Sequence, residues 1–357
     1  MVIINILVAL LIFGIIILVH EAGHFVTAKL CGVRVNEFAM GMGPAIFKKK
    51  RGETTYSLRA FPIGGYCAME GEDTDSTDDR AFGKKSVPKR MAIILAGAFM
   101  NIVLGMVLIV IMTVINGPIT SRTVSNFSEN SSTQATGLQL GDEIVSINGM
   151  HIFTDMDINY QLTSDKDGVF DMTVLRNGEK VKLTGVTMIK EGDNLHLDFH
   201  VKPTPLTVGS VAKETVFRTV TYSRLVWISL RDLALGRYHL NDLSGPVGIV
   251  DVIGQVIDDQ TANAPVDSSG KADIDWSALI ATILQMSALI TVNIGLFNLL
   301  PFPALDGGRF VFLAVEGVRG KPLKPEREGL VHLVGMAVLL TLMVAVAFND
   351  IMRIIKR

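Results

Sequence analysis

The feature that most constrains this chain is a set of four long apolar stretches, because a spanning helix needs about 20 mostly apolar residues. The stretches cover residues 2–30, 91–115, 276–300 and 330–348, and no charged side chain lies between Val2 and Val19. Charged residues make up only 19% of the 357 residues, whereas soluble domains usually carry about 25%. Length and composition therefore predict an α-helical polytopic membrane protein with four transmembrane helices.

Composition also excludes several classes of function. The net charge is -2, and a nucleic-acid partner would typically require a basic excess. The two cysteines, Cys31 and Cys67, cannot form a disulfide framework or a CxxC metal site. The first apolar stretch lacks a basic leader and a small-residue cleavage site, so we expect it to be retained as a span.

The basic residues of the connections predict the orientation, since Lys and Arg are enriched in short cytoplasmic loops. The connection 31–90 carries Lys48, Lys49, Lys50, Arg51, Lys84, Lys85, Lys89 and Arg90, and the connection 309–329 carries Arg309, Arg319, Lys321, Lys324 and Arg327. Both connections lie on one side of a four-span protein, so that side should be cytoplasmic. The N-terminus, the segment 118–275 and the C-terminus would then face outward, although the basic tail Arg353, Lys356 and Arg357 counts against this orientation.

The cytoplasmic region 31–90 shows the alternation of apolar and polar residues that is typical of β-strands, at 33–35 and 54–59, with a turn at 50–53. The segment 61–66 reads FPIGGY and is apolar, glycine-rich and uncharged. We expect a membrane-associated β-hairpin that dips toward the bilayer and offers a strand edge at Gly64 and Gly65. An ordinary cytoplasmic hairpin is the alternative. The acidic segment 70–80 is expected to be a mobile loop.

The segment 118–202 predicts a compact β-rich domain. Residues 137–149 read GLQLGDEIVSING, which closely resembles the PDZ pattern and ends in the hairpin turn Asn148-Gly149. A second hairpin is expected at 176–179. PDZ domains bind extended peptides by adding a strand to an exposed edge, although a structural spacer would show the same pattern.

Residues 203–275 predict an amphipathic helical region with a break at 243–249, followed by a polar linker at 258–275. This region would lie on the outer membrane surface or pack on the PDZ domain.

The first span contains the pattern HEAGH at residues 20–24. Residues four apart share one face of a helix, so His20 and His24 can place two imidazoles on one metal ion. Glu21 lies close enough to act on a water that the metal activates. Ionisable side chains inside an apolar span are costly, and a functional role is the default interpretation. A helix end at the interface with merely polar histidines is the alternative.

A catalytic zinc usually has three protein ligands and an open position, so a third ligand is needed from elsewhere. Asp306 is the best candidate, because it follows the third span where two prolines open the helix and glycines allow close approach. In the four-span arrangement, both parts of the site lie at the same depth near the cytoplasmic side. The sequence therefore predicts a Zn²⁺ site made by His20, His24 and Asp306.

This set of residues predicts peptide-bond hydrolysis. Glu21 would act as the general base and pass the proton to the leaving amine. Asn298 is expected to hydrogen-bond the substrate backbone or the oxyanion, with helix capping as the alternative. A helical substrate must unwind first, so Gly64, Gly65 and the proline-broken end of the third span, at Pro301, are candidate partners for the extended peptide.

The motifs HEAGHF at 20–25 and NLLPFPALDGG at 298–308, with a PDZ pattern between the second and third spans, resemble the site-2 protease family. The resemblance is greatest to its bacterial regulator-of-sigma-E protease (RseP/RasP-like) branch and extends along nearly the whole chain. The family motifs map onto His20, Glu21 and His24, onto Asp306, and onto Asn298 and Pro301. The segment GAFMN at 97–101 departs from the family's usual Gly-Pro before the second-span Asn.

The resemblance implies a zinc-dependent intramembrane endopeptidase of the bacterial plasma membrane. It would make the second cut of regulated intramembrane proteolysis, after an upstream site-1-type protease. Its substrates would be single-span proteins such as anti-sigma factors and signal peptide remnants. Two other interpretations remain at this point: a PDZ membrane scaffold with a structural zinc, and a metal transporter. Glu21 favours the enzyme, because a structural zinc site needs no general base.

Overall fold

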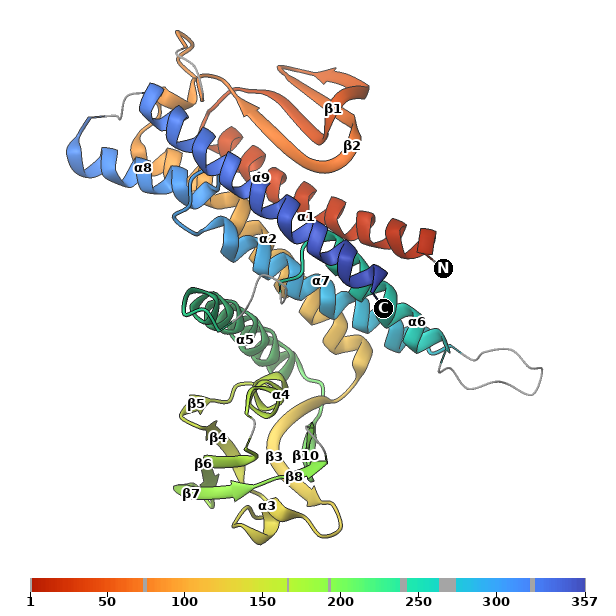
Figure 1. Ribbon diagram of the computed structural model, residues 1–357. Coiled ribbons are helices and arrows are strands. Elements are labelled where there is room, and N and C mark those ends of the chain that lie inside the picture. Colours follow the sequence, from red (N-terminus) through yellow and green to blue (C-terminus); the bar gives the residue numbers. More distant parts are fainter. Residues whose placement is uncertain are drawn as a thin grey trace. The chain divides into compact units, whose positions relative to one another are not determined.

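The computed structural model describes residues 2–72, 76–165, 167–191, 194–237, 243–262, 274–321 and 325–356. The chain divides into two compact units (Figure 1). The first unit contains Met1–Leu108 and Val226–Arg357, and the second contains Ile109–Leu225. The expected linker 258–275 begins inside a helix, and its residues 263–273 lie outside the described part of the chain.

Four of the described helices are long and apolar enough to cross a membrane. They are α1 (Val2–Leu30), α2 (Val87–Asn116), α7 (Trp276–Asn298) and α9 (Pro325–Ile355). The expectation of a polytopic membrane protein with four candidate spans is therefore confirmed. Helix α2 begins at Val87, before the expected start at residue 91, because Pro88 lies in the first turn, where its missing N–H is not needed.

Two further helices of the first unit complete the packing of the spans. Helix α6 (Pro246–Ala262) buries Ile253 and Ile257 against Ile12 and Ile16 of α1, together with Leu279 of α7. It therefore packs on the spans, an arrangement that the sequence did not predict, and the expected break at 243–249 ends at Pro246. The buried Asp350 of α9 accepts hydrogen bonds from the N–H groups of Gly245 and Gly248, at 2.9 and 2.8 Å, and so caps the start of α6.

The connection 309–329, treated above as a loop, contains helix α8 (Asp306–Arg319). Its charged residues suggested a loop, but its apolar residues lie on one face. Phe310 and Leu313 pack with Ile93 and Ile94 of α2. The bidentate ion pair between Arg90 and Glu316 also joins α2 to α8. Helix α8 thereby fixes the direction in which the chain leaves the loop after α7.

A β-sheet follows α1 and is built from only two long strands, β1 (Val35–Arg51) and β2 (Thr54–Met69), with the turn between them at the expected place. The strands bend at Gly41, Gly43 and Gly64, which have positive φ values of 85°, 84° and 77°. The bends bring both ends of β2 beside the start of β1, so that Phe38 pairs with Tyr56 and with Cys67. Residues 65–69 pair only with 35–40 among the described residues, which leaves their other edge open.

One face of α1 lies along this sheet. The residues involved recur every three or four positions, as expected for one side of a helix. They contact the sheet in the order Gly14 with Met40, Ile17 and Glu21 with Gly65, Phe25 with Phe38 and Tyr56, and Lys29 with Glu53. At 1.5 Å per residue, the sheet accompanies α1 over about 22 Å. The sheet thus reaches from the end of α1 to the middle of its apolar segment.

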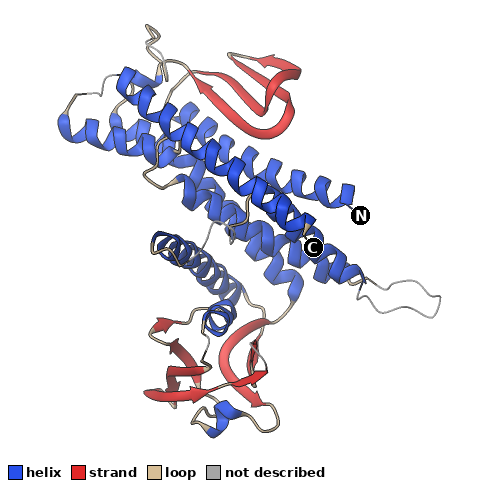
Figure 2. Ribbon diagram, viewed as in Figure 1, coloured by secondary structure: helices blue, strands red, loops and turns tan. Residues whose placement is uncertain are grey.

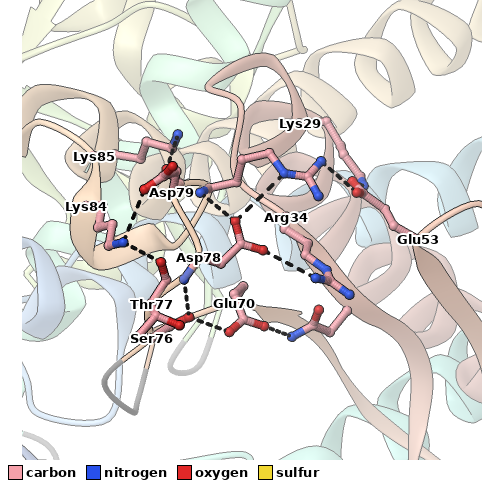
Figure 3. Close-up of polar contacts among 12 residues, drawn as sticks. Lys29, Arg34, Glu53, Glu70, Ser76, Thr77, Asp78, Asp79, Lys84 and Lys85 are labelled. Atoms are coloured by element: carbon pink, nitrogen blue, oxygen red, sulfur yellow. Dashed lines mark hydrogen bonds and ion pairs between the residues drawn. The ribbon is translucent and has the colours of Figure 1, made fainter.

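A polar network secures the sheet and the segment after it to the end of α1 (Figure 3). Glu53, in the hairpin turn, forms ion pairs with Lys29 at 2.5 Å and with Arg80 at 2.7 Å. Asp78 accepts from Arg34 at 3.2 Å, and Glu70 accepts from Ser76 at 2.6 Å. The described residues of the 70–80 segment, which was expected to be a mobile loop, are therefore tied to the sheet. A short 3-10 helix, η1 (Phe82–Lys84), follows.

The second unit is a β-rich domain (Figure 2). Its main sheet has the order β10-β3-β4-β6-β7, with β5 paired to β4. The strands are β3 (Ile119–Phe127), β4 (Glu143–Ile147), β5 (Met150–His151), β6 (Val169–Arg176), β7 (Glu179–Thr187) and β10 (Phe199–Thr204), and β8 (Ile189–Glu191) pairs with β9 (Asn194–His196). Both expected hairpin turns are present, with positive φ at Asn148 and Asn177. The PDZ assignment stays a prediction.

Three helices accompany these strands: α3 (Ser132–Ala135), α4 (Asp155–Ser164) and α5 (Val208–Ala234). The part of α5 that belongs to the second unit is held by buried charges. Arg218 pairs with Asp155 at 2.9 Å and with Glu214 at 2.7 Å, and Arg224 pairs with the buried Asp157. The amphipathic helix expected after the β-rich domain therefore packs on that domain through ion pairs.

Candidate metal centre

The structure brings together the three side chains that the sequence singled out as metal ligands. His20 and His24 lie on one face of α1, and their Nε2 atoms are 3.2 Å apart. Asp306, the first residue of α8, places Oδ2 at 3.3 Å from His20 Nε2 and 3.5 Å from His24 Nε2. Tetrahedral zinc with bonds of about 2.0–2.1 Å requires donor atoms about 3.3 Å apart. The spacing of the three atoms fits a zinc ion.

The carboxylate of Asp306 lies at ion-pair distance from the two imidazoles but makes no hydrogen bond through Oδ2 to the described residues. Its Oδ2 is buried, and no hydrogen-bond donor for it is found among the described residues. A buried carboxylate oxygen without a partner is costly, and paired or metal-bound carboxylates are the usual remedy. A cation between Asp306 and the two imidazoles would satisfy this atom.

Helix α2 orients the two imidazoles. His24 Nδ1 lies 2.9 Å from the carbonyl oxygen of Ile93, so Nδ1–H donates and Nε2 keeps its lone pair for a metal. The side-chain nitrogen of Asn101, a fully buried residue, lies 3.3 Å from His20 Nδ1. With its oxygen turned toward His20, Asn101 would accept from Nδ1–H and leave Nε2 as the ligand atom. Such partners set the tautomer and the orientation of metal-binding histidines.

Glycines allow α2 to approach the histidines closely. A Cβ atom at Gly97 would lie 2.3 Å from His24 Nε2 and 2.7 Å from His20 Cε1. On the other helix, a Cβ atom at Gly23 would lie 2.4 Å from the carbonyl oxygen of Ala96. The departure GAFMN thus contains Gly97 and Asn101, two residues that touch the site and that sequence reasoning did not include. A buried Asn inside an apolar span was the available signal for Asn101.

Glu21, the predicted general base, lies where β2 passes over α1. A Cβ atom at Gly65 would lie 3.0 Å from Glu21 Cγ and 3.2 Å from Ile17 Cγ2. Gly64, with φ at 77°, precedes this contact and packs against Met42. Of the predicted substrate-binding residues, Gly65 therefore lies directly beside Glu21, and Gly64 forms the bend that leads to it.

Asn298 and Pro301 lie at the end of α7 and in the loop that follows it. Asn298 is the last residue of α7 and is half-buried, and no hydrogen-bond partner of its amide lies within the described ranges. Pro301 is exposed in the loop between α7 and α8. Neither residue has a recorded contact with His20, His24 or Asp306 in the part of the chain that the structure describes. Their roles stay proposals.

Cys67, on β2, is close enough to Glu21 for the two side chains to interact electrostatically. Burial, aided by the negative charges of Glu21 and Glu72, raises the pKa of the Cys67 thiol to about 12. The donor atoms that lie within 4.8 Å of one another among the described residues belong to His20, His24 and Asp306, and Cys67 is not part of this group.

Comparison with known proteins identifies the family of the chain. The model of peptidase family M50 matches residues 8–342. The chain belongs to peptidase family M50. A Clostridium acetobutylicum protein named as a candidate zinc metalloprotease is 38% identical, with 97% of each chain covered. Zinc metalloprotease RasP of Geobacillus kaustophilus is 28% identical, with 96% of this chain and 97% of the relative covered.

Regulator of sigma-W protease RasP of Bacillus subtilis is also 28% identical, with 97% of each chain covered. The chain is therefore a zinc-dependent metalloprotease of the site-2 protease family, similar to RasP proteins. With its four candidate spans, it is a membrane metalloprotease. Membership of a peptidase family favours the enzyme over the two alternatives, the membrane scaffold and the metal transporter, because neither of these functions includes peptide-bond hydrolysis.

Proposed function

We propose that this metalloprotease cleaves single-span membrane proteins within the membrane, as the second cut of regulated intramembrane proteolysis. The observation that carries the proposal is the cluster of His20, His24 and Asp306, whose donor atoms are 3.2–3.5 Å apart. Both histidines belong to α1, a helix that is apolar enough to span a membrane. Glu21 belongs to the same helix and faces a β-strand. The three metal ligands, the general base and strand β2 therefore lie together beside α1.

Each residue of the site is proposed to have a separate role in the reaction. Zinc bound by His20, His24 and Asp306 would supply Lewis-acid activation of a water and of the scissile carbonyl. Glu21 takes the proton from the attacking water and delivers it to the leaving amine. Ile93 and Asn101 hold the imidazole rings in the orientation that directs Nε2 toward the metal. Asn298 is proposed to donate to the substrate carbonyl.

The sheet supplies the means to hold an extended substrate. A peptide in a helix has its carbonyls bonded internally, so the segment to be cut must unwind. The edge of residues 65–69 has no strand partner among the described residues and runs past Glu21 at Gly65. An added substrate strand would satisfy its backbone groups there, as in other cases of strand addition. Gly64 and Gly65 would therefore place the scissile bond beside the metal.

The exposed side chains of the hairpin support its proposed position in the cytoplasmic leaflet. Ile46, Phe47 and Phe61 are 71%, 58% and 60% exposed, which suits contact with lipid. The basic residues 48–51 follow directly and are also exposed, as expected for side chains at headgroup level. In this orientation the active site lies near the cytoplasmic side and the second unit, the proposed PDZ domain, faces outward.

The substrate class rests on the relatives. One of them is named for regulation of sigma-W, and we propose anti-sigma-factor-like proteins and signal peptide remnants as substrates of this chain. An upstream site-1-type protease would first remove the outer part of the substrate. The proposed PDZ domain would then recruit or filter the trimmed product.

The test is cleavage of a tagged single-span substrate, already trimmed on its outer side, by protein reconstituted in liposomes. Wild type should cut, whereas Glu21→Gln should bind zinc in equal amount and leave the substrate intact. Glu179→Gln, at the exposed first residue of β7 in the second unit, is the matched control and should cut like wild type. Failure of wild type to cut several such substrates while zinc is bound would remove the proposed substrate class.

A further inference from the structure

The loop that presents Asp306 depends on a contact from a distant helix. After α7 the chain passes Pro301 and Pro303, which have no N–H groups, and then Ala304, whose φ is 77°. A positive φ in a residue with a Cβ is strained and persists only where neighbouring groups enforce it. Ala304 lies two residues before Asp306, so its conformation helps to set where the carboxylate points.

Helix α9 supplies that enforcement through two residues one turn apart. The N–H of Ala304 donates to His332 Nδ1 at 3.0 Å. Gly335 packs on Pro303 so closely that a Cβ atom there would lie 2.4 Å from Pro303 Cβ and 2.6 Å from its carbonyl oxygen. Each contact would be lost if α9 moved away from the loop.

The rest of this part of α9 points outward. His332 is 16% exposed and Gly335 is buried, whereas the neighbouring apolar side chains are 40–64% exposed: Val331, Leu333, Val334, Met336 and Val338. The inward positions are thus the two that hold the loop. A helix that served only as an anchor in lipid would have no use for an imidazole there.

The state of the His332 ring fits the role of an acceptor. The ring packs edge-on against Phe312 of α8, with centroids 5.4 Å apart and planes at 78°. Because Nδ1 accepts from the Ala304 N–H, the proton of the neutral ring lies on Nε2, and a carboxylate oxygen of Glu328 is 4.0 Å from that atom. The imidazole is therefore fixed from two sides with its acceptor toward Ala304.

We propose that His332 is a positioning residue of the metal centre, which acts by fixing the Ala304 amide and with it the Asp306 carboxylate. The inference rests on the proposed ligand role of Asp306. Without His332, the Ala304 N–H would have to find another partner, and the loop could relax toward an unstrained φ. Asp306 Oδ2 would then leave its position 3.3–3.5 Å from the imidazole nitrogens. Loss of such supporting contacts typically weakens metal binding about 10- to 100-fold.

Two substitutions of nearly equal polarity separate this role from simple packing. In His332→Asn, the side-chain oxygen can occupy the place of Nδ1 and accept from Ala304. In His332→Gln, the amide lies further out, nearer the place of Nε2, and cannot reach Ala304 in the same way. Leu333→Ala, on the outward face of α9, is the control for helix packing.

The experiment uses the full-length protein in detergent. The zinc dissociation constant is measured by competition with a chromophoric chelator, and the visible spectrum of the cobalt-substituted protein reports the ligand geometry. We expect His332→Gln to bind zinc about 10- to 100-fold more weakly with an altered cobalt spectrum. His332→Asn and Leu333→Ala should stay close to wild type.

Equal losses in His332→Asn and His332→Gln would overturn the proposal, as would wild-type affinity and spectrum in His332→Gln. Gly335→Ala is a second variant that keeps the imidazole but pushes on Pro303, and it should also weaken zinc binding. The metal centre itself is tested independently of these results. It is supported if the wild-type protein cuts its substrate and the Asp306→Ala variant loses zinc. If Asp306→Ala keeps its zinc, the proposed ligand set itself fails.

Discussion

A single methyl group added to α2 should remove the metal from this protein. In Gly97→Ala, the new Cβ would lie 2.3 Å from His24 Nε2, whereas an ordinary contact needs at least 3.4 Å. The imidazole would have to retreat by about 1.1 Å, and metal sites tolerate deviations of only about 0.2 Å in ligand distance. His24 cannot turn aside freely, because its Nδ1 is hydrogen-bonded to Ile93. His20 Cε1, at 2.7 Å from the same Cβ, would be displaced as well.

Displacement of two ligands should cost more than the loss of one supporting contact. We expect zinc affinity to fall by about 100-fold or more, which corresponds to about 3 kcal/mol. Zinc content after dialysis against a chelator buffer, together with chelator competition, measures this effect. Cleavage should be lost in parallel.

The control is Gly329→Ala, a glycine of α9 with nothing within 4 Å of a new Cβ. This substitution should leave zinc binding unchanged and slightly stabilise the helix, since Ala favours helices over Gly by about 1 kcal/mol. If Gly97→Ala keeps wild-type zinc affinity and activity, α2 does not approach the histidines as closely as described. The assignment of Nε2 as the ligand atom would then be refuted too.

Three other substitutions test separate parts of the molecule. Asn101→Leu removes the partner of His20 Nδ1 and should weaken zinc binding about tenfold, measured by chelator competition. Gly65→Val places a side chain against Glu21 and Ala39, so cleavage should fall while zinc content stays at the wild-type level; a parallel loss of zinc would contradict the strand-edge role. Arg176→Ala leaves the buried Asp142 carboxylate without its cation and should destabilise the second unit by about 3 kcal/mol, seen as faster amide exchange in β4 with zinc binding unaffected.

Much of the site could be predicted because several of its residues occur in short sequence patterns with a fixed spacing. His20 and His24 are four residues apart on a helix, a spacing that places both on one face whatever the tertiary structure. Asp306 could be predicted because the two prolines before it end an apolar span, and an acidic residue directly after such a span is a candidate for the missing metal ligand. The turns at Asn148 and Asn177 were predictable for the same reason, since a positive φ has few sequence solutions.

The contributions of α2, α6, α8 and α9 could not be predicted, because each depends on packing between distant segments. Gly97 is an ordinary small residue until α2 lies against the histidines, and His332 is one polar residue of a span until Ala304 lies beside it. Helix α8 was taken for a loop because its charges suggested solvent, whereas Arg90 and Glu316 pair across two helices. Contacts between segments that are far apart in the sequence leave no pattern of fixed spacing from which they could be predicted.

The depth of Glu21 explains, under the proposed function, why a helical membrane protease carries a β-sheet. Glu21 lies nine residues before the end of α1 at Leu30, about 13 Å along the helix. A peptide that is unwound at this depth cannot bond its backbone to water, and lipid offers no partners. Two non-helical segments lie beside Glu21 and Asp306: the open strand edge of 65–69, which contacts Glu21 at Gly65, and the loop after α7, which leads directly to Asp306. The sheet contact at Gly65 and the loop fixed by His332 therefore serve one requirement: a stable place for an extended backbone next to the metal.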